Sequence, residues 1–90
     1  MSSVKIETNP SQARLDELGV KQWPIWTCDV SEFDWHYDDN EICYFLEGAV
    51  VVKAEGREFT IKKDDLAFFP KGLKCRWKVT TPVRKYYKLG

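Results

Sequence analysis

Apolar and polar residues alternate along most of this chain, in short runs separated by turn residues. Aromatic residues occupy every second position from Phe33 to Tyr37, and Phe59 and Ile61 repeat the pattern after the Glu55-Gly56 turn. Alternation with a period of two is typical of a β-strand with one buried face. The other segments with strand character are 4–8, 49–54, 66–69, 74–79 and 83–89. Short strands at this spacing predict a sandwich or a closed barrel.

A single short helix is expected near the N-terminus. Pro10 and Ser11 are suited to its start, Leu15 and Leu18 share one face, and Gly19 follows where a left-handed C-cap belongs. Ninety residues correspond to one domain. We therefore predict an all-β fold in which residues 1–22, a strand and this helix, pack on a barrel formed by residues 23–90.

Two of the predicted strands carry opposite charges. In residues 32–37 acidic residues alternate with aromatic ones, and in residues 74–79 basic residues alternate with apolar ones. Side by side, these strands would place opposite charges outside and apolar side chains inside, so we predict that they are antiparallel neighbours. The side chains expected to face inward are Trp35, Tyr37, Cys75 and Trp77. The basic stripe alone is typical of a nucleic-acid site, but its acidic neighbour favours a solvated face.

Composition excludes several classes of partner and location. Fourteen basic residues balance fourteen acidic ones, so no nucleic acid or anionic membrane is expected as partner. The longest apolar run, residues 42–46, is far too short to span a bilayer, and the first residues lack the apolar core of a secretory signal. The irregularly spaced Cys28, Cys43 and Cys75 are interpreted as reduced thiols. We expect a cytoplasmic protein, with an organelle after removal of a transit peptide as the alternative.

Two stretches resemble the sequence motifs of the cupin superfamily. Residues 41–48, Glu-Ile-Cys-Tyr-Phe-Leu-Glu-Gly, are similar to the E-x6-G end of the first motif. Residues 64–72 are similar to the second motif from its P-x-G onward, with Asp64 in place of the opening glycine. Over roughly residues 23–88 the chain resembles small single-domain cupins grouped with ureidoglycine aminohydrolase and the ethanolamine-utilisation Q-type proteins. The resemblance implies a single cupin-type jelly-roll β-barrel.

The resemblance also identifies the positions at which cupins bind a divalent metal. Cupins use two histidines, a glutamate and a third histidine, where this chain has Trp35, Tyr37, Glu41 and Cys75. One carboxylate and one thiol are too few ligands, so we expect no metal or other cofactor. The alternative is zinc held by His36, Glu41 and Cys75, which requires a bulge to turn His36 inward. Under strict alternation His36 points to solvent.

The aromatic content indicates a ligand cavity inside the barrel. Four Trp, four Tyr and five Phe are many for ninety residues, and a small barrel can hold one small ligand. We predict that the protein binds a small organic molecule, with Glu41 and Tyr37 supplying polar contacts. The expected lining is Trp35, Tyr37, Glu41, Phe45, Phe68, Cys75 and Trp77.

Two other classes of function remain open. The first is an enzyme, either metal-independent or similar to an aminohydrolase or isomerase, with Glu41 as acid and base. Poor solvation raises a carboxyl pKa and suits this role, and the change of Glu41 to Gln would then abolish catalysis while leaving the fold intact. Cys75 is a second catalytic candidate, as a nucleophile. The other class is a structural protein whose side chains fill the barrel. Residues 84–87 are interpreted as structural or surface residues, and the sheet edges of such a fold are compatible with a homodimer.

Overall fold

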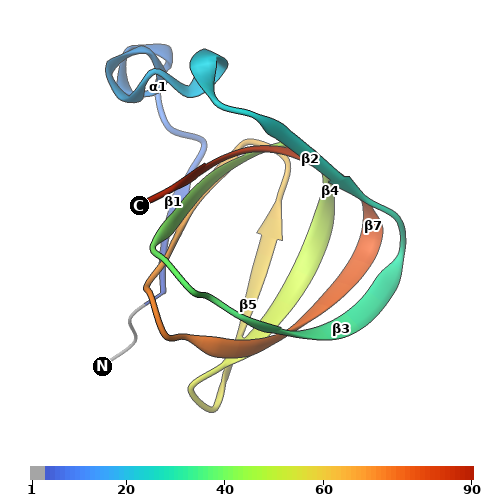
Figure 1. The fold of residues 1–90 in the computed structure, drawn as a ribbon. Coiled ribbons are helices and arrows are strands. Elements are labelled where there is room, and N and C mark those ends of the chain that lie inside the picture. The colour runs from blue at the N-terminus through green and yellow to red at the C-terminus, as the bar shows by residue number, and fades with distance from the viewer. Residues whose placement is uncertain (1–3) are drawn as a thin grey trace.

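The computed structural model describes residues 4–90 as a seven-stranded antiparallel barrel with one α-helix and one short 3₁₀ helix (Figure 1). The strands are β1 (Lys5–Thr8), β2 (Ile25–Cys28), β3 (Ser31–His36), β4 (Glu41–Ala54), β5 (Arg57–Lys62), β6 (Asp65–Phe69) and β7 (Lys74–Leu89). The helical segments are α1 (Gln12–Leu18) and η1 (Val20–Gln22), which lie outside the ring of strands (Figure 1). The prediction of an all-β barrel with one α-helix is confirmed.

Two long strands, β4 and β7, organise the sheet. They pair with each other, and the hydrogen-bonded order runs β1-β6-β4-β7-β2, with β3 also paired to β7 and β5 to β4. Because β7 has 16 residues and β4 has 14, each can pair with several shorter strands along its length. Most side chains of the cavity described below therefore come from these two strands and from the strands beside β7.

The N-terminal segment forms a strand and a helix, as predicted. The Ser11 Oγ accepts a hydrogen bond from the Arg14 backbone N–H at 3.2 Å, which caps the start of α1. Gly19 ends the helix in the left-handed conformation, with φ of 71°. The strand β1 pairs with β6, so the segment adds an edge strand to the sheet. Residues 1–3 of the predicted segment 1–22 lie outside the described residues.

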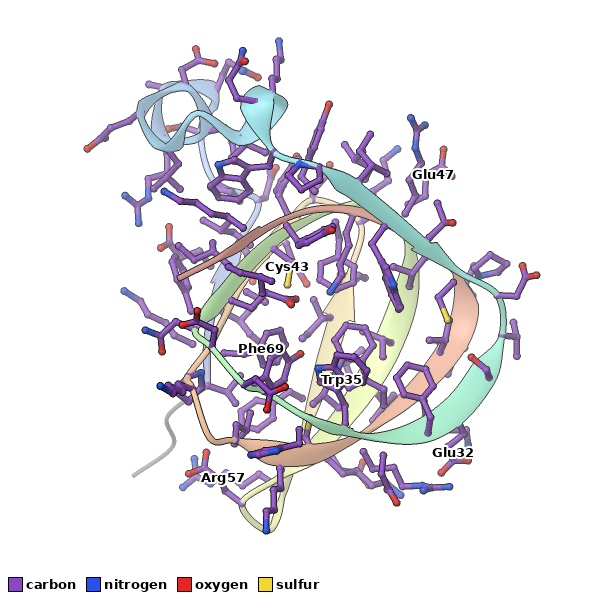
Figure 2. The ribbon with its side chains drawn as sticks, in the orientation of Figure 1. Glu32, Trp35, Cys43, Glu47, Arg57 and Phe69 are labelled. Carbon is purple, nitrogen blue, oxygen red and sulfur yellow. The ribbon has the colours of Figure 1, made fainter. Side chains whose placement is uncertain are left out.

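The predicted pairing of the two charged strands is confirmed. Strands β3 and β7 are antiparallel, and Phe33 lies opposite Trp77 while Trp35 lies opposite Cys75. On the outer face Arg76 donates hydrogen bonds to Glu32 at 2.7 Å and to Asp34 at 2.8 Å. Figure 2 shows Trp35 within the outline of the barrel and Glu32 outside it. The alternating pattern therefore specified both faces of this strand pair.

Strand β4 changes phase in its middle. Inward-facing residues have odd numbers before the change, such as Cys43 and Phe45, and even numbers after it, such as Val50 and Val52. The register against β7 shifts between Phe45 and Val50, around Gly48. Gly48 has φ of 88°, and a Cβ there would overlap the Pro82 carbonyl. Only glycine fits this close crossing of two strands.

Three features of the sheet differ from the sequence prediction. Strand β4 begins at Glu41, whereas strand character was predicted only for residues 49–54. Strand β2 was not predicted, because its four residues carry no alternation long enough to recognise. Segments 74–79 and 83–89 were predicted as separate strands but form the continuous β7. Pro82 lacks an N–H, and it lies in the gap between the paired positions Thr81 and Val83. None of the helices among residues 4–90 is long and apolar enough to cross a membrane.

Candidate functional site

A cavity of about 260 Å³ lies inside the barrel. Its walls are largely aromatic, with one acidic and one basic side chain among them. The lining consists of Trp26, Phe33, Trp35, Tyr37, Glu41, Trp77, Lys85, Tyr87 and Leu89. Trp35 is 50% exposed and Leu89 is also largely exposed, so these two residues form part of the cavity mouth. Figure 2 shows Cys43 and Phe69 within the barrel, whereas Glu47 and Arg57 lie outside it.

A buried ion pair forms the polar wall of the cavity. The Lys85 Nζ donates a hydrogen bond to Glu41 Oε2 at 2.9 Å, and the two residues are 5% and 8% exposed. The Cys43 Sγ lies 3.1 Å from the same oxygen and 3.6 Å from Lys85 Nζ. The pairing of β4 with β7 brings these groups together. Lys85 lies opposite Phe45, and Cys43 and Glu41 follow at alternate positions of β4 on the same inward face. Each charge thus has a partner, which buried charges require.

Aromatic rings surround the Lys85 ammonium. Its Nζ lies 4.6 Å from the ring centroid of Trp77, 4.8 Å from that of Trp26 and 5.8 Å from that of Phe45. These distances fall within the range of cation–π attraction, which is strongest for desolvated cations. The ammonium therefore occupies a cage of three aromatic side chains of its own chain.

The Lys85 amine is protonated at neutral pH. Burial lowers the pKa of Lys85, but the neighbouring Glu41 carboxylate raises it, and the pKa lies above its usual range. Burial is also the main cause of the raised pKa of Cys43, which keeps that residue a neutral thiol. The charged partner of the ammonium is consequently the Glu41 carboxylate.

Two residues that line the cavity, Tyr37 and Trp77, each carry a buried polar atom with no hydrogen-bond partner within residues 4–90. These atoms are the Tyr37 Oη and the Trp77 Nε1, and both residues are 2% exposed. The Tyr37 ring stacks on Phe69, with centroids 4.9 Å apart. Burial raises the pKa of Tyr37, so the hydroxyl keeps its proton. An unsatisfied buried polar group costs about 1–3 kcal/mol. A hydrogen bond from either group to an added acceptor would remove this cost.

The structure places four of the seven expected lining residues on the cavity wall: Trp35, Tyr37, Glu41 and Trp77. Phe45 is fully buried, with its ring stacked at 6.3 Å from Trp77. Cys75 faces inward opposite Trp35 but is packed in the core, where burial raises its pKa to about 11. Such a thiol is a poor nucleophile at neutral pH.

The expectation for Phe68 is wrong. Alternation along β6 places Ala67 and Phe69 in the core, whereas Phe68 lies on the opposite face, with Lys5 Nζ 5.4 Å from its ring centroid. Phe69, which stacks on Tyr37, occupies the interior position instead.

The residues do not fit a divalent metal. Strand β3 continues without a bulge through the pairs of Trp35 with Cys75 and His36 with Lys74, so the inward turn of His36 is not realised. His36 is exposed on the outer face, 3.7 Å from Asp38. Glu41 is already paired with Lys85, and no cluster of three potential metal ligands occurs in residues 4–90.

Sequence reasoning missed five residues that line the cavity and one neighbour of the ion pair. The lining residues are Trp26, Phe33, Lys85, Tyr87 and Leu89, and the neighbour is Cys43. Lys85 was interpreted as a surface or structural residue, as most lysines are. The available signal was its position between Val83 and Tyr87, where alternation gives all three the same face. A lysine on the apolar face of a strand indicates a buried charge that pairs with an acidic residue on another strand.

Comparison with known proteins agrees with this fold. Residues 15–87 match the EutQ-like cupin domain family. The chain is 33% identical over 86 residues to the acetate kinase EutQ of Clostridioides difficile (strain 630), covering 88% of this chain and 55% of that protein. It thus spans about half the length of the curated relative it matches.

Two solved structures support the same assignment. A DUF861 family protein from Thermotoga maritima is 58% identical, with a TM-score of 0.94 over 98% of this chain and 100% of that one. A putative ethanolamine utilization protein Q from Salmonella typhimurium LT2 is 32% identical, with a TM-score of 0.67 over 72% of this chain and 53% of that one. The predicted cupin-type jelly-roll barrel is confirmed, and the chain belongs to the family of EutQ-like cupin domains.

Proposed function

We propose that this cupin domain binds a small organic molecule in the barrel cavity. The observation that carries the proposal is the cavity of about 260 Å³, with aromatic walls and a buried Glu41–Lys85 ion pair on one side. Ligand sites are typically concave and mostly apolar, with a few placed polar groups that orient the ligand.

The cavity size limits the ligand. An apolar cavity of roughly 150 Å³ is large enough for benzene, and pockets for drug-sized ligands begin near 300 Å³. A volume of about 260 Å³ therefore suits one ring with a substituent, or a metabolite of similar size. The proposed site uses no metal, because Lys85 already supplies a positive charge beside Glu41. We also propose a cytoplasmic location, which the free thiols of Cys28, Cys43 and Cys75 support.

A second candidate function is acid–base catalysis on such a molecule. The observation that favours it is the contact of a carboxylate and an ammonium with the same cavity, since these groups can serve as base and acid. The raised pKa of Lys85 weakens it as an acid at neutral pH, so binding is the leading proposal. Turnover of a bound molecule that disappears in Glu41→Gln, at a temperature where a melting curve shows this variant to be folded, would support the enzyme instead.

The proposal is tested by screening a metabolite library by ligand-observed NMR. Leu89→Trp narrows the mouth, and Val30→Trp is the matched control, because Val30 is also exposed but does not line the cavity. We expect hits that bind the native protein and Val30→Trp but not Leu89→Trp. Hits that bind all three equally, or no hits at all, would contradict the proposal. Native mass spectrometry of protein purified without a metal-chelating tag should show well under one metal per chain.

A further inference from the structure

Three residues that line the cavity carry a buried hydrogen-bond donor with spare capacity. The Trp77 Nε1 is a donor only, and the protonated Tyr37 hydroxyl is a donor as well; neither has a partner within residues 4–90. The Lys85 ammonium has three N–H groups, of which Glu41 Oε2 and Cys43 Sγ accept two. All three residues line the same cavity. The ligand that satisfies them must supply an acceptor atom.

The aromatic walls do not favour a cationic ligand group beside Glu41. Ring faces attract cations, but the Lys85 ammonium already lies over Trp26, Trp77 and Phe45. The negative charge of Glu41 is likewise paired with Lys85. A ligand ammonium would have to displace that lysine from both its carboxylate and its cage.

A carboxylate fits the same groups without displacing any of them. It accepts hydrogen bonds only, and each oxygen can accept from more than one donor. Hydrogen bonds to a charged acceptor contribute more than those between neutral groups. The remaining apolar wall, with Trp35 and Leu89 at the mouth, is suited to a planar ring.

We infer that the cavity binds a small planar carboxylate, whose oxygens accept hydrogen bonds from Lys85, Trp77 and Tyr37. This inference rests on the proposed function and adds the ligand class to it. Tyr37 is then a binding residue: its hydroxyl contributes to the affinity for the ligand and not to the stability of the fold.

The experiment uses four one-ring probes: benzoate, benzamide, benzylamine and toluene. Their dissociation constants are measured by NMR titration of the ¹⁵N-labelled full chain, with the indole N–H signal of Trp77 as a site-specific readout. We expect benzoate to bind most tightly and to move this proton downfield, as a new hydrogen bond does. Toluene should bind without that downfield shift.

The variant that tests the donor set is Tyr37→Phe, with Tyr44→Phe as the matched control. The Tyr44 hydroxyl bonds to Asp64, and Tyr44 does not line the cavity. We expect Tyr37→Phe to weaken benzoate binding by roughly tenfold or more and to leave toluene unchanged. Tyr44→Phe should leave both unchanged. A melting curve establishes that each variant is folded.

Several outcomes would overturn the inference. If benzylamine binds more tightly than benzoate, the site selects cations. If benzamide binds as tightly as benzoate, the site does not require a carboxylate. An unchanged benzoate affinity in Tyr37→Phe would show that the Tyr37 hydroxyl does not bind the ligand. If toluene binds and benzoate does not, the inference fails while the proposed function stands. If no probe binds, the inference fails, and the metabolite screen decides the proposed function separately.

Discussion

Lys85 and Glu41 meet inside the barrel, with Nζ and Oε2 2.9 Å apart. The cupin-like motif places Glu41 where related barrels have a metal-binding glutamate, and here its partner is an ammonium on β7. The contact therefore joins one motif residue to one residue that the motifs do not include. Its effect on folding follows from the burial of both charges.

Removing either charge alone should destabilise the fold strongly. Lys85→Met leaves the Glu41 carboxylate buried without a counter-charge, and Glu41→Gln does the same to the ammonium. Breaking a buried pair in this way typically costs about 3–5 kcal/mol, whereas replacing both charges can be neutral. We expect the double variant to be more stable than either single one in urea denaturation. This result would correct the expectation that Glu41→Gln leaves the fold unaffected.

The control for that cycle is the surface pair of Glu7 and Arg14, 2.9 Å apart. Because this pair is partly solvated, Glu7→Gln should barely move the denaturation midpoint. Strictly additive effects of Glu41→Gln and Lys85→Met would show that the buried charges do not depend on each other.

Two tyrosines should respond oppositely to loss of the hydroxyl. The Tyr37 hydroxyl has no hydrogen-bond partner within residues 4–90, so Tyr37→Phe should leave stability unchanged or raise it. Tyr44 donates to Asp64 Oδ1 at 3.3 Å, so Tyr44→Phe should lose about 0.5–1.5 kcal/mol. Thermal or urea unfolding measures both. A clear loss in Tyr37→Phe would mean that its hydroxyl is bonded within the folded chain.

The buried thiols predict a loss of stability at alkaline pH. Burial raises the pKa of Cys75 to about 11 and raises that of Cys43 as well, whereas an unfolded thiol titrates near 8.5. Above that pH the unfolded state binds fewer protons than the folded state, so stability falls as pH rises. The expected slope is about 1.4 kcal/mol per pH unit for each thiol between pH 9 and 11.

Urea denaturation across this range measures the slope. Cys75→Ala should reduce it, and Cys28→Ala is the control, because Cys28 is only partly buried. At pH 8 iodoacetamide should label Cys28 faster than Cys43 or Cys75 in the folded protein. Equal labelling of all three would contradict the assignment of two protected thiols.

Gly48 should be the glycine least tolerant of substitution. Ala at Gly48 faces both a φ of 88° and overlap with the Pro82 carbonyl. At Gly72 φ is 87°, but no atom lies within 4 Å of the added Cβ, so Gly72→Ala isolates the effect of φ. We expect Gly72→Ala to cost about 1–2 kcal/mol and Gly48→Ala roughly 1–3 kcal/mol more. Equal unfolding midpoints for Gly48→Ala and Gly72→Ala would show that β4 and β7 move apart easily at this crossing.

The sequence predicted best where one face of a strand is polar. Residues 32–37 and 74–79 alternate, so their pairing and the inward positions of Trp35 and Trp77 could be predicted. Phe68 was assigned to the wrong face because residues 66–69 are all apolar, and such a run does not show which face is inside. Lys85 was missed because its partner lies 44 positions earlier, on another strand.

The phase change in β4 has a consequence for insertions and deletions. Glu41 and Cys43 face the interior by odd positions, and Val50 and Val52 by even ones, so the two halves of this strand are set one residue apart. Gaining or losing one residue between Phe45 and Val50 would alter the register shifts that let both halves of β4 face the interior while paired with β7. Changes in length are absorbed more easily at the turns, such as the one at Glu55-Gly56. Length variation within this protein's lineage is therefore expected at the hairpin tips and not at the centre of β4.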